Sequence, residues 1–325
     1  MTDPFSISVI TPSFNQAAYL EQTILSVLNQ NIPSLQYIVI DGNSTDGSQE
    51  IIRKHEKRLA YWVSEPDRGQ ADAINKGLAR AEGEIVAWLN SDDYYLPGCL
   101  ATVLTAFAQN PDTGLIFGNV LSVDADSRPI NLMRYDNWEL NDLMRFRIIG
   151  QPGVFFRRSV MKKAGLLDTS YHYLLDHQYW LRLARIAPIQ HIPKTLAAAR
   201  FHPAAKNVAM ATEFGKEAFR LVEWMQFDAD FSQHYRRYQR KIKAGAYWIN
   251  ARYLSESGEI KKAIASYFRS FFYHPQPVLE DWRRFVYTLV SLLGLGKLQP
   301  LAYKLRDSRR KRRLSESQIG IHHES

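Results

Sequence analysis

The sequence predicts an α/β fold, with a mostly parallel sheet flanked by helices and an all-α extension after it. Short apolar runs alternate with helix-period patterns from Ile7 to His202, which is typical of a parallel sheet with helices on both faces. Beyond Ala209 the pattern is helical throughout, and a basic run follows it. We therefore expect three parts: an α/β catalytic domain at 1–208, a helical region at 209–305, and a basic tail outside the folded core at 306–325.

Composition and charge limit the class of protein. At 325 residues and 46% hydrophobic, the chain is long enough for one large domain and a smaller appendage. Cys99 is the only cysteine, which excludes an intrachain disulfide and favours a reducing compartment. We see neither a secretory signal at the start nor a run of about 18 apolar residues. These features predict a cytoplasmic protein, and the basic tail leaves open a peripheral contact with the anionic inner face of the plasma membrane.

Five predicted strands and four helices account for the first third of the chain. Runs rich in β-branched and aromatic residues that stop at turn residues predict strands at Ile7–Thr11, Tyr37–Asp41, Tyr61–Ser64, Ile85–Leu89 and Gly114–Val120. Apolar residues at helical spacing predict helices at Leu20–Leu28, Gln49–Leu59, Gln70–Ala81 and Leu100–Phe107. Neighbouring polar residues and glycines predict the helix ends: Asn15 as an N-cap, Asp46 with Gln49 as a capping box, and Gly83 as a C-terminal stop.

Polar side chains follow the first four strands at the point where each strand ends. They are Asn15, Asp41, the pair Asp67 and Arg68, and the pair Asp92 and Asp93. Open α/β sheets bind ligands at the carboxyl ends of their strands, so we expect these side chains along one edge. Asp41 ends a buried strand, where a carboxylate must be hydrogen-bonded or bind a ligand. No glycine-rich dinucleotide or Walker pattern follows these strands, which argues against a dinucleotide oxidoreductase or a P-loop enzyme.

The adjacent carboxylates Asp92 and Asp93 allow two interpretations. At the end of a buried strand they suit a hard divalent cation that carries a phosphate. Alternatively, one of them caps a helix that begins near Leu96, with Pro97 at an early position. A cap needs one carboxylate only, and the second would repel it without compensation. The residues alone leave both interpretations open.

The second half of the chain adds one further acidic candidate. Between Leu121 and Gly150 the pattern predicts a loop-rich insertion with a short helix at 138–146, before a strand at Val154–Phe156 and a helix capped by Ser159. The block LLDHQYWLRLA predicts a helix with Asp176 in its first turn, where the helix dipole favours a carboxylate even without a function. A strand-like segment then ends near His202 and Lys206.

The helical region contains two features of interest. Residues 246–275 have the small and aromatic spacing of one tetratricopeptide-like helix pair. One such pair cannot bury its own face, so we expect it to pack on other helices or on the α/β domain. The last helix, at about Val278 to Leu293, carries an apolar stripe that suits either core packing or a membrane surface.

Five blocks of the chain, taken together, resemble the family 2 inverting glycosyltransferases of the GT-A fold. The resemblance covers roughly residues 5–207, and the blocks follow the order seen in that family. They read VITPSFNQAAYLEQTILSVLNQ, YIVIDGNSTDGS, SEPDRGQADAINKG, GEIVAWLNSDDYYLPG and LLDHQYWLRLA. The resemblance implies a Rossmann-like fold for nucleotide-diphospho-sugar transfer and favours the cation interpretation of Asp92 and Asp93.

The resemblance also implies roles for the donor-binding residues. Pro12, Ser13 and Asn15 match the first nucleotide-contacting loop, and Asp41 matches the aspartate that receives the base. Asp67 and Arg68 match the segment that closes over base and diphosphate. Asn90, Ser91 and Asp92 stand where the family has its D-x-D motif, whose last aspartate reaches the cation. Since Asn90 replaces the first acid, Asp92 and Asp93 remain as the anionic pair, and Asn90 is left to hydrogen-bond the ribose.

Two further positions carry over from the same family. Asp176 matches the catalytic base of the E-D motif, although Leu175 replaces the glutamate and Gln178 replaces a common second acid. His202 and Lys206 fall where related enzymes place a late loop that touches the diphosphate. The resemblance thus implies Mn²⁺ or Mg²⁺ as cofactor, a nucleotide sugar with uracil as donor, and a glycan or lipid-linked acceptor in polysaccharide or glycolipid synthesis.

Two other function classes compete with this one. A nucleotidyltransferase of similar fold needs a glycine-rich, basic triphosphate loop after the first strand, and TPSFNQAAYL has neither property. An inactive sugar-nucleotide-binding or scaffold protein is disfavoured by the intact set Asp41, Asp92, Asp93 and Asp176. The basic tail lacks interleaved aromatic residues, so we expect no specific nucleic-acid binding. Oligomeric state, donor sugar and acceptor identity have no signal in the sequence.

Overall fold

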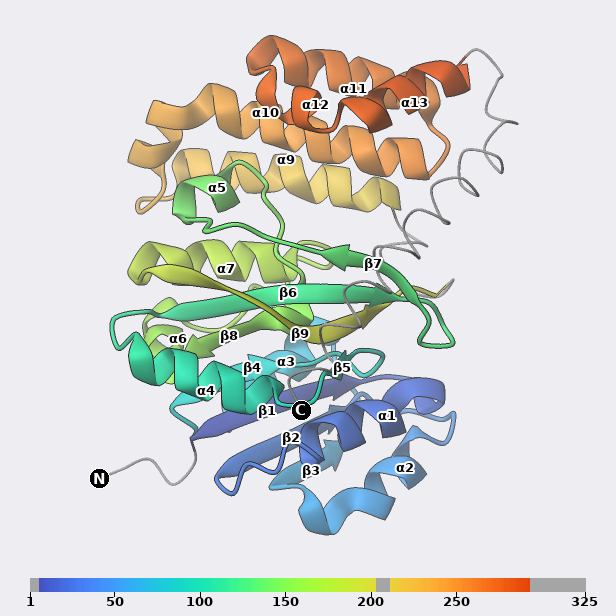
Figure 1. Ribbon diagram of the computed structural model, residues 1–325, viewed down its shortest axis with the longest axis vertical. Coiled ribbons are helices and arrows are strands. Elements are labelled where there is room, and N and C mark those ends of the chain that lie inside the picture. The colour runs from blue at the N-terminus through green and yellow to red at the C-terminus, as the bar shows by residue number, and fades with distance from the viewer. Residues whose placement is uncertain (1–5, 203–210, 293–325) are drawn as a thin grey trace, which may run out of the picture. The chain divides into compact units, whose positions relative to one another are not determined.

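The computed structural model describes residues 6–202 and 211–292 (Figure 1). The chain divides into two units, Met1–Ser127 with Met133–His202, and Arg128–Leu132 with Pro203–Ser325. Lys206 and the tail at 306–325 lie outside the described residues. The first unit is α/β and the second is helical apart from its short 128–132 segment.

The first unit begins with strands and helices that alternate as far as β4. They are β1 (Ile7–Ser13), α1 (Ala17–Leu28), β2 (Leu35–Asp41), α2 (Ser48–His55), β3 (Tyr61–Ser64), α3 (Gln70–Leu78), β4 (Ile85–Trp88), β5 (Tyr94–Tyr95) and α4 (Cys99–Gln109). The rest comprises β6 (Leu115–Val123), β7 (Pro129–Met133), α5 (Leu140–Met144), β8 (Val154–Arg157), α6 (Arg158–Ala164), α7 (Leu175–Ile186) and β9 (Ile189–Arg200), and the division between the units crosses β7. Every strand predicted before residue 120 is present, and β5 and β7 are additional.

The sheet is mixed and mostly parallel, as the sequence predicted. Its strands follow the order β3-β2-β1-β4-β8-β6-β9-β5. The pairs β1–β2, β1–β4, β2–β3 and β6–β9 are parallel, whereas β8 runs antiparallel to both β4 and β6. Ser13 pairs with Asp41, and Asp41 with Ser64, so the carboxyl ends of the first three strands are level.

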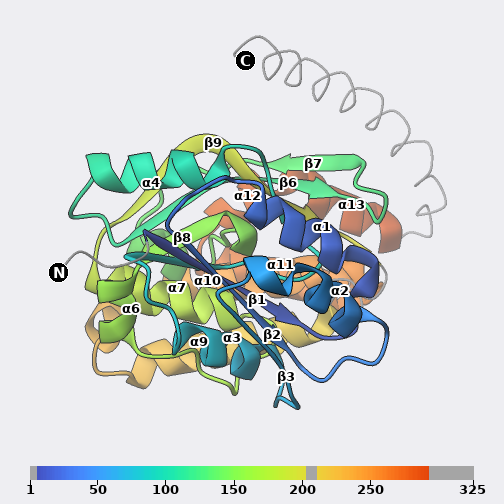
Figure 2. The same ribbon diagram turned by 90° about the horizontal axis from the view of Figure 1, so that it is seen from below.

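Helices cover both faces of the sheet and bury its side chains. One face packs Val9, Val39 and Ala87 against α1, α2 and α4 in a single apolar cluster. The opposite face carries Ile10, which lies so close to α3 that a methyl group on Gly77 would be 2.3 Å from Ile10. Figure 2 shows α1 and α2 on one side of β1–β3 and α3 on the other. Helices on both faces leave the strand ends as the accessible part of this sheet.

Several predicted helix ends are wrong, and the contacts show why. Gln16 rather than Asn15 is the N-cap of α1, because Asn15 takes a left-handed backbone (φ 50°) and uses its side chain elsewhere. Asp46 forms no capping box with Gln49, since Gly47 is the N-cap and Gln49 bonds the Ser44 carbonyl. Ser159 lies inside α6, which is preceded by Arg157.

Gly83 does not end the preceding helix either. That helix, α3, stops at Leu78 with Ala79 as its C-cap. Gly83 instead packs on β1, where an added methyl group would lie 2.4 Å from the Ser8 nitrogen. Its own N–H donates to Ser8 Oγ at 2.7 Å. The glycine is therefore required by close backbone approach and not by helix termination.

The helical unit contains α9 (Ala211–Phe227), α10 (Ser232–Glu256), α11 (Ile260–Tyr273), α12 (Gln276–Glu280) and α13 (Trp282–Leu292). Within this unit α10 lies between α9 and the group α11–α13 (Figure 1). The expected last helix is broken in two at Asp281. Across the described residues, no helix combines the length and the apolarity that a membrane span requires.

Candidate active site

The ends of β1 and β2 are joined by hydrogen bonds from the loops that follow them. The backbone N–H of Asn15 donates to Ser44 Oγ at 2.8 Å, and Asn15 Oδ1 accepts from the Thr45 N–H at 2.9 Å. Ser44 Oγ in turn donates to Asp41 Oδ1 at 2.6 Å. The loop after Pro12 and Ser13 is thus fixed against the loop after Asp41, at the predicted edge of the sheet.

The Asp41 carboxylate is fully buried and already holds three hydrogen bonds. Oδ2 accepts from the Ser44 N–H at 2.9 Å and from Ser64 Oγ at 2.6 Å, in addition to the Ser44 hydroxyl on Oδ1. The expectation that this carboxylate must be hydrogen-bonded or ligand-bound is confirmed, with protein donors. Its expected role as the aspartate that receives the base stays a prediction.

Asp67 and Arg68 lie at the same edge, but their side chains differ in contacts and in exposure. Asp67 Oδ1 accepts from the Gly69 N–H at 2.8 Å, and Asp67 packs so closely on Gly42 that a methyl group there would lie 2.5 Å from Asp67 Oδ2. The Arg68 side chain is 84% exposed, and its contact with Asp72 at 3.1 Å is a surface ion pair. Exposed ion pairs contribute little to the free energy of unfolding. The Arg68 guanidinium can therefore leave Asp72 and turn toward a ligand with a small loss of free energy.

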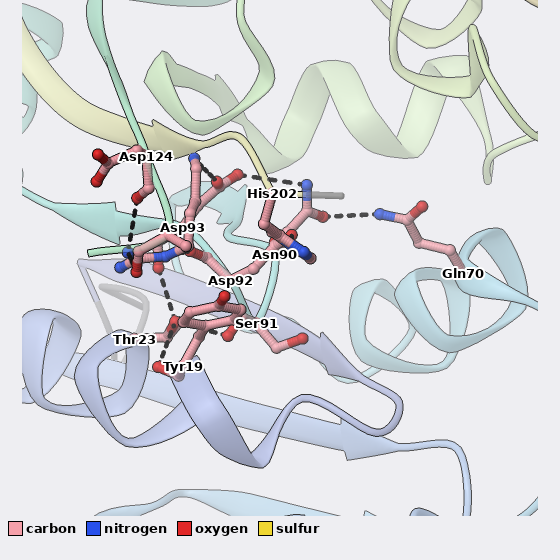
Figure 3. A network of polar contacts seen from close by, with 11 residues as sticks. Tyr19, Thr23, Gln70, Asn90, Ser91, Asp92, Asp93, Asp124 and His202 are labelled. Carbon is pink, nitrogen blue, oxygen red and sulfur yellow. Dashed lines mark hydrogen bonds and ion pairs between the residues drawn. The ribbon is translucent and has the colours of Figure 1, made fainter. Parts of the chain in front are cut away.

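The turn at Asn90–Asp93 is held from two directions (Figure 3). Asn90 Oδ1 accepts from Gln70 Nε2 of α3 at 2.8 Å. Thr23 Oγ1 of α1 lies 2.7 Å from the Asp93 carbonyl oxygen and 2.9 Å from that of Ser91, so its proton is shared between them. The helix after this turn begins at Cys99 with Gly98 as its N-cap, which excludes the alternative that Asp92 or Asp93 caps it.

Asp93 points into the protein and serves the structure. Its Oδ1 accepts from the Arg200 backbone N–H at 2.9 Å, and its Oδ2 lies 3.5 Å from Asn90 Nδ2. Burial raises the pKa of the Asp93 carboxyl well above its usual range, and the charge of neighbouring Asp92 raises it further. Both Asp93 carboxyl oxygens therefore face groups of the protein, and its expected role as a metal ligand stays a prediction.

Asp92 is the accessible carboxylate of the pair, and an imidazole accompanies it. Asp92 Oδ2 lies 3.2 Å from His202 Nε2, and the His202 ring packs on Tyr19 with ring centroids 5.0 Å apart. The Asp92 side chain is 20% exposed and that of His202 is 7% exposed. Two donors this close fit one divalent cation, and carboxylate oxygen and imidazole nitrogen both suit Mn²⁺. No group of three or more potential side-chain ligands occurs in residues 6–202 and 211–292, so the cation would complete its shell with ligand or water oxygens.

Asp176 comes from a different element. It lies in the first turn of α7, half-buried, and its Oδ1 accepts from the His177 N–H at 2.7 Å. Trp180 is one helical turn later on the same face and stacks on Trp88, with ring centroids 4.7 Å apart. Trp88 ends β4, two residues before Asn90. This packing fixes the first turn of α7 relative to β4, the strand that leads into the turn.

Arg200 is the residue that the sequence analysis missed. It is 4% exposed, and its guanidinium donates to the carbonyl oxygens of Asp92, Asp124 and Ala125. It also donates to Ser127 Oγ at 3.0 Å and to Gln22 Oε1 at 2.6 Å. The sequence did contain evidence for this role. Arg200 is the charged residue that ends the run TLAAAR, and a buried guanidinium at that position needs several hydrogen-bond acceptors.

This polar edge on a mostly parallel sheet defines the class of protein as a GT-A-like α/β unit. Solved structures share the fold: the chain has a TM-score of 0.58 with S. aureus TarS 1–349 in complex with UDP-GlcNAc, at 14% identity, covering 86% of this chain and 92% of that chain. For the mannosyltransferase PcManGT from Pyrobaculum calidifontis in complex with GDP-Man and Mn²⁺, the TM-score is 0.55 at 18% identity, covering 89% and 86%. The chain covers half of a longer TarS chain.

Sequence comparisons give the family. Residues 8–164 match Glycosyl transferase family 2. An uncharacterized glycosyltransferase of Mycobacterium tuberculosis is 30% identical over 194 residues, which are 57% of this chain and 71% of that protein. The Bacillus subtilis protein TuaG, named for teichuronic acid biosynthesis, is 46% identical over 90 residues, which are 27% of this chain and 36% of TuaG. The chain belongs to glycosyl transferase family 2.

Proposed function

We propose that this glycosyltransferase inverts the anomeric centre as it moves a sugar from a UDP-sugar to an acceptor hydroxyl in cell-envelope polysaccharide or glycolipid synthesis. The observation that carries the proposal is the pairing of Asp92 with His202 at the edge where the β1, β2 and β4 loops meet. Two similar proteins support the donor and the acceptor class: TarS is bound to UDP-GlcNAc, and TuaG is named for teichuronic acid biosynthesis.

The nucleoside end of the donor is assigned to the loops after β1, β2 and β3. Phe14 is 58% exposed and lies beside Gly42 and Asp67, which offers an apolar surface next to a carboxylate. Ser13 Oγ is buried without a hydrogen-bond partner among the described residues, so it has capacity for one more contact. Pro12, Ser13 and Asn15 then flank the base, and Asp41 holds the Ser44 loop that borders it.

The diphosphate end is assigned to the Asn90–Asp93 turn, with Arg68 and Lys206 as cationic contacts. Asp92 and His202 are the side chains that would hold Mn²⁺ or Mg²⁺ there. When bound, such a cation neutralises the charge that grows on the leaving diphosphate. Arg200 and Asp93 keep the Asp92 backbone in place. We assign the ribose to Asn90 and Ser91.

Asp176 is the proposed general base. As a half-buried carboxylate it would accept the proton of the acceptor hydroxyl while that oxygen attacks the anomeric carbon from the face opposite the diphosphate. A correctly placed base contributes roughly 10²- to 10⁴-fold to the rate. A single displacement of this kind inverts the configuration.

The donor assignment is tested by thermal shift with a panel of nucleotide sugars, with and without Mn²⁺. Ligands that bind the folded state alone raise the unfolding midpoint, by an amount set by concentration over Kd. We expect UDP-sugars with Mn²⁺ to give the largest rise and GDP-mannose a smaller one. A larger rise with GDP-mannose would contradict the uracil assignment. Pyrophosphate release from UTP and a sugar phosphate would instead indicate a nucleotidyltransferase.

A further inference from the structure

The outer layer of the helical unit exposes an unusual number of large apolar side chains. Within residues 268–292, eight such side chains are between 37% and 77% exposed: Phe268, Phe271, Phe272, Leu279, Trp282, Val286, Val290 and Leu292. Single exposed apolar side chains are common on protein surfaces, but a cluster of this size is typical of an interaction site. We call this set the α11–α13 patch.

The patch is continuous across two helices. In α11, Phe268 and Phe272 fall on one stripe, turned away from the buried residues Ala263 and Ser270. In α13, Trp282, Val286 and Val290 form a second stripe at four-residue spacing, while Thr288 faces α10. Phe285 joins the two stripes, because its ring lies 5.8 Å from that of Phe268. The two helices form the layer beyond α10 in Figure 1.

Cations border the apolar stripes. Lys261 is exposed on the Phe268 stripe, two turns before Phe268, and Arg269 is exposed beside it. Arg283 lies over the Trp282 ring, 5.6 Å from its centroid. The sequence after α13 continues this charge in RDSRRKRR from Arg306 to Arg313.

The carboxylates near the patch are already engaged. Asp281 Oδ2 accepts from Trp248 Nε1 at 3.2 Å and lies 3.6 Å from Arg284 Nε. Glu280 accepts from Gln276 at 2.8 Å, and Glu259 pairs with Lys262 at 3.1 Å. The exposed cations Lys261, Arg269 and Arg283 therefore give the patch an excess of positive charge, which favours a negatively charged partner surface.

We propose that the α11–α13 patch binds the surface of an anionic lipid bilayer. Aromatic side chains with adjacent arginine and lysine match the boundary between lipid headgroups and acyl chains, where the rings bury apolar area and the cations meet headgroup phosphates. Cations near an anionic surface add to the attraction, and the basic run at 306–313 supplies more of them. The inference does not depend on the proposed transfer reaction.

A site-specific probe tests this directly. Cys99 is the only cysteine and is buried, so one added surface cysteine can be labelled alone. Phe272→Cys places an environment-sensitive fluorophore in the patch. Phe227→Cys places it on α9 at a phenylalanine of matched exposure, 73% against 77%. Both variants of the 325-residue chain are titrated with vesicles of phosphatidylglycerol and phosphatidylcholine, and with vesicles of phosphatidylcholine alone.

The patch predicts a blue shift at position 272 with phosphatidylglycerol vesicles and little change at position 227. Phe272→Glu should lower vesicle co-sedimentation about tenfold, while Phe227→Glu leaves it unchanged. Equal shifts at the two positions, or none, would overturn the proposal. A lipid-independent shift at 272 that grows with protein concentration would show a second copy of the chain as the occupant. A shift already complete without lipid would show that the chain covers its own patch.

Discussion

The backbone N–H of Arg200 donates a 2.9 Å hydrogen bond to Oδ1 of Asp93, while the Arg200 guanidinium binds the carbonyl of Asp92. One residue at the end of β9 therefore holds the carboxylate of Asp93 and the backbone of Asp92. The Asp93 side chain is buried, whereas the Asp92 carboxylate faces His202. The environments of the two adjacent acids differ because of these contacts.

Arg200→Lys should destabilise the protein and weaken donor binding together. A lysine cannot reach the acceptors on Gln22, Ser127 and the 124–125 carbonyls at once, so buried acceptors would lose their donors. We expect a loss of about 2–4 kcal/mol in the free energy of unfolding, measured by urea denaturation. Arg53→Lys is the control, since Arg53 makes an exposed ion pair with Glu50 and should change stability by less than about 0.5 kcal/mol. Equal losses in both variants would refute the role of Arg200.

Asp92→Asn and Asp93→Asn should separate ligand binding from folding. Asp92→Asn removes the accessible charge beside His202, so we expect at least about a tenfold loss of Mn²⁺-dependent affinity for the donor. Asp93→Asn resembles the protonated acid that burial favours, and its oxygen can still accept from Arg200. We expect it to change affinity less than about threefold. Titration calorimetry with UDP and Mn²⁺ measures both, and a larger effect for Asp93 would restore it as the metal ligand.

The pattern of residues predicted the strands well because their signals are local. The first four strands lie within a few residues of the predicted runs, and Asp41 is hydrogen-bonded at the end of its strand as its burial required. The predicted helix N-caps were wrong because several neighbouring residues fit the same sequence rule for an N-cap. Asp46 illustrates this: it accepts from the N–H of Ser48 in α2 and also from Ala17 in α1, a contact 29 positions away that no local rule contains.

The parts of the site that depend on distant contacts could not be predicted. The burial of Asp93 and the pairing of Asp92 with His202 both follow from where β9 ends, and the separation of 110 positions between Asp92 and His202 hides that relationship. The antiparallel insertion of β8 and the two-residue strand β5 likewise depend on pairing with β6 and β9. The family resemblance identified His202 as a candidate residue, and the structure shows that its partner is Asp92.

His177 should make stability depend on pH between about 4 and 6.5. Burial lowers the pKa of His177 to about 4, because its ring is fully enclosed; the 3.0 Å contact with the Leu143 carbonyl raises the pKa and offsets only part of this effect. The unfolded chain binds a proton at its ordinary pKa, so this contribution is complete above pH 6.5 and is lost as the pH falls toward 4. The total effect is about 3 kcal/mol.

His177→Gln keeps an N–H donor and removes the titration. We therefore expect its urea midpoint to fall less steeply than that of the original chain between pH 6.5 and 4. His172→Gln is the control, because His172 is exposed. Parallel pH profiles for His177→Gln and the original chain would contradict the assignment.

In the proposed mechanism, Asp176 acts on the acceptor while Asp92 and His202 act on the donor. The most direct measurement compares Asp176→Asn with the original chain in two assays, calorimetric affinity for UDP-sugar with Mn²⁺ and the rate of sugar transfer. We predict donor affinity within about threefold and a transfer rate lower by roughly 10²- to 10⁴-fold. A variant that loses donor affinity, or that transfers at the original rate, would contradict the account.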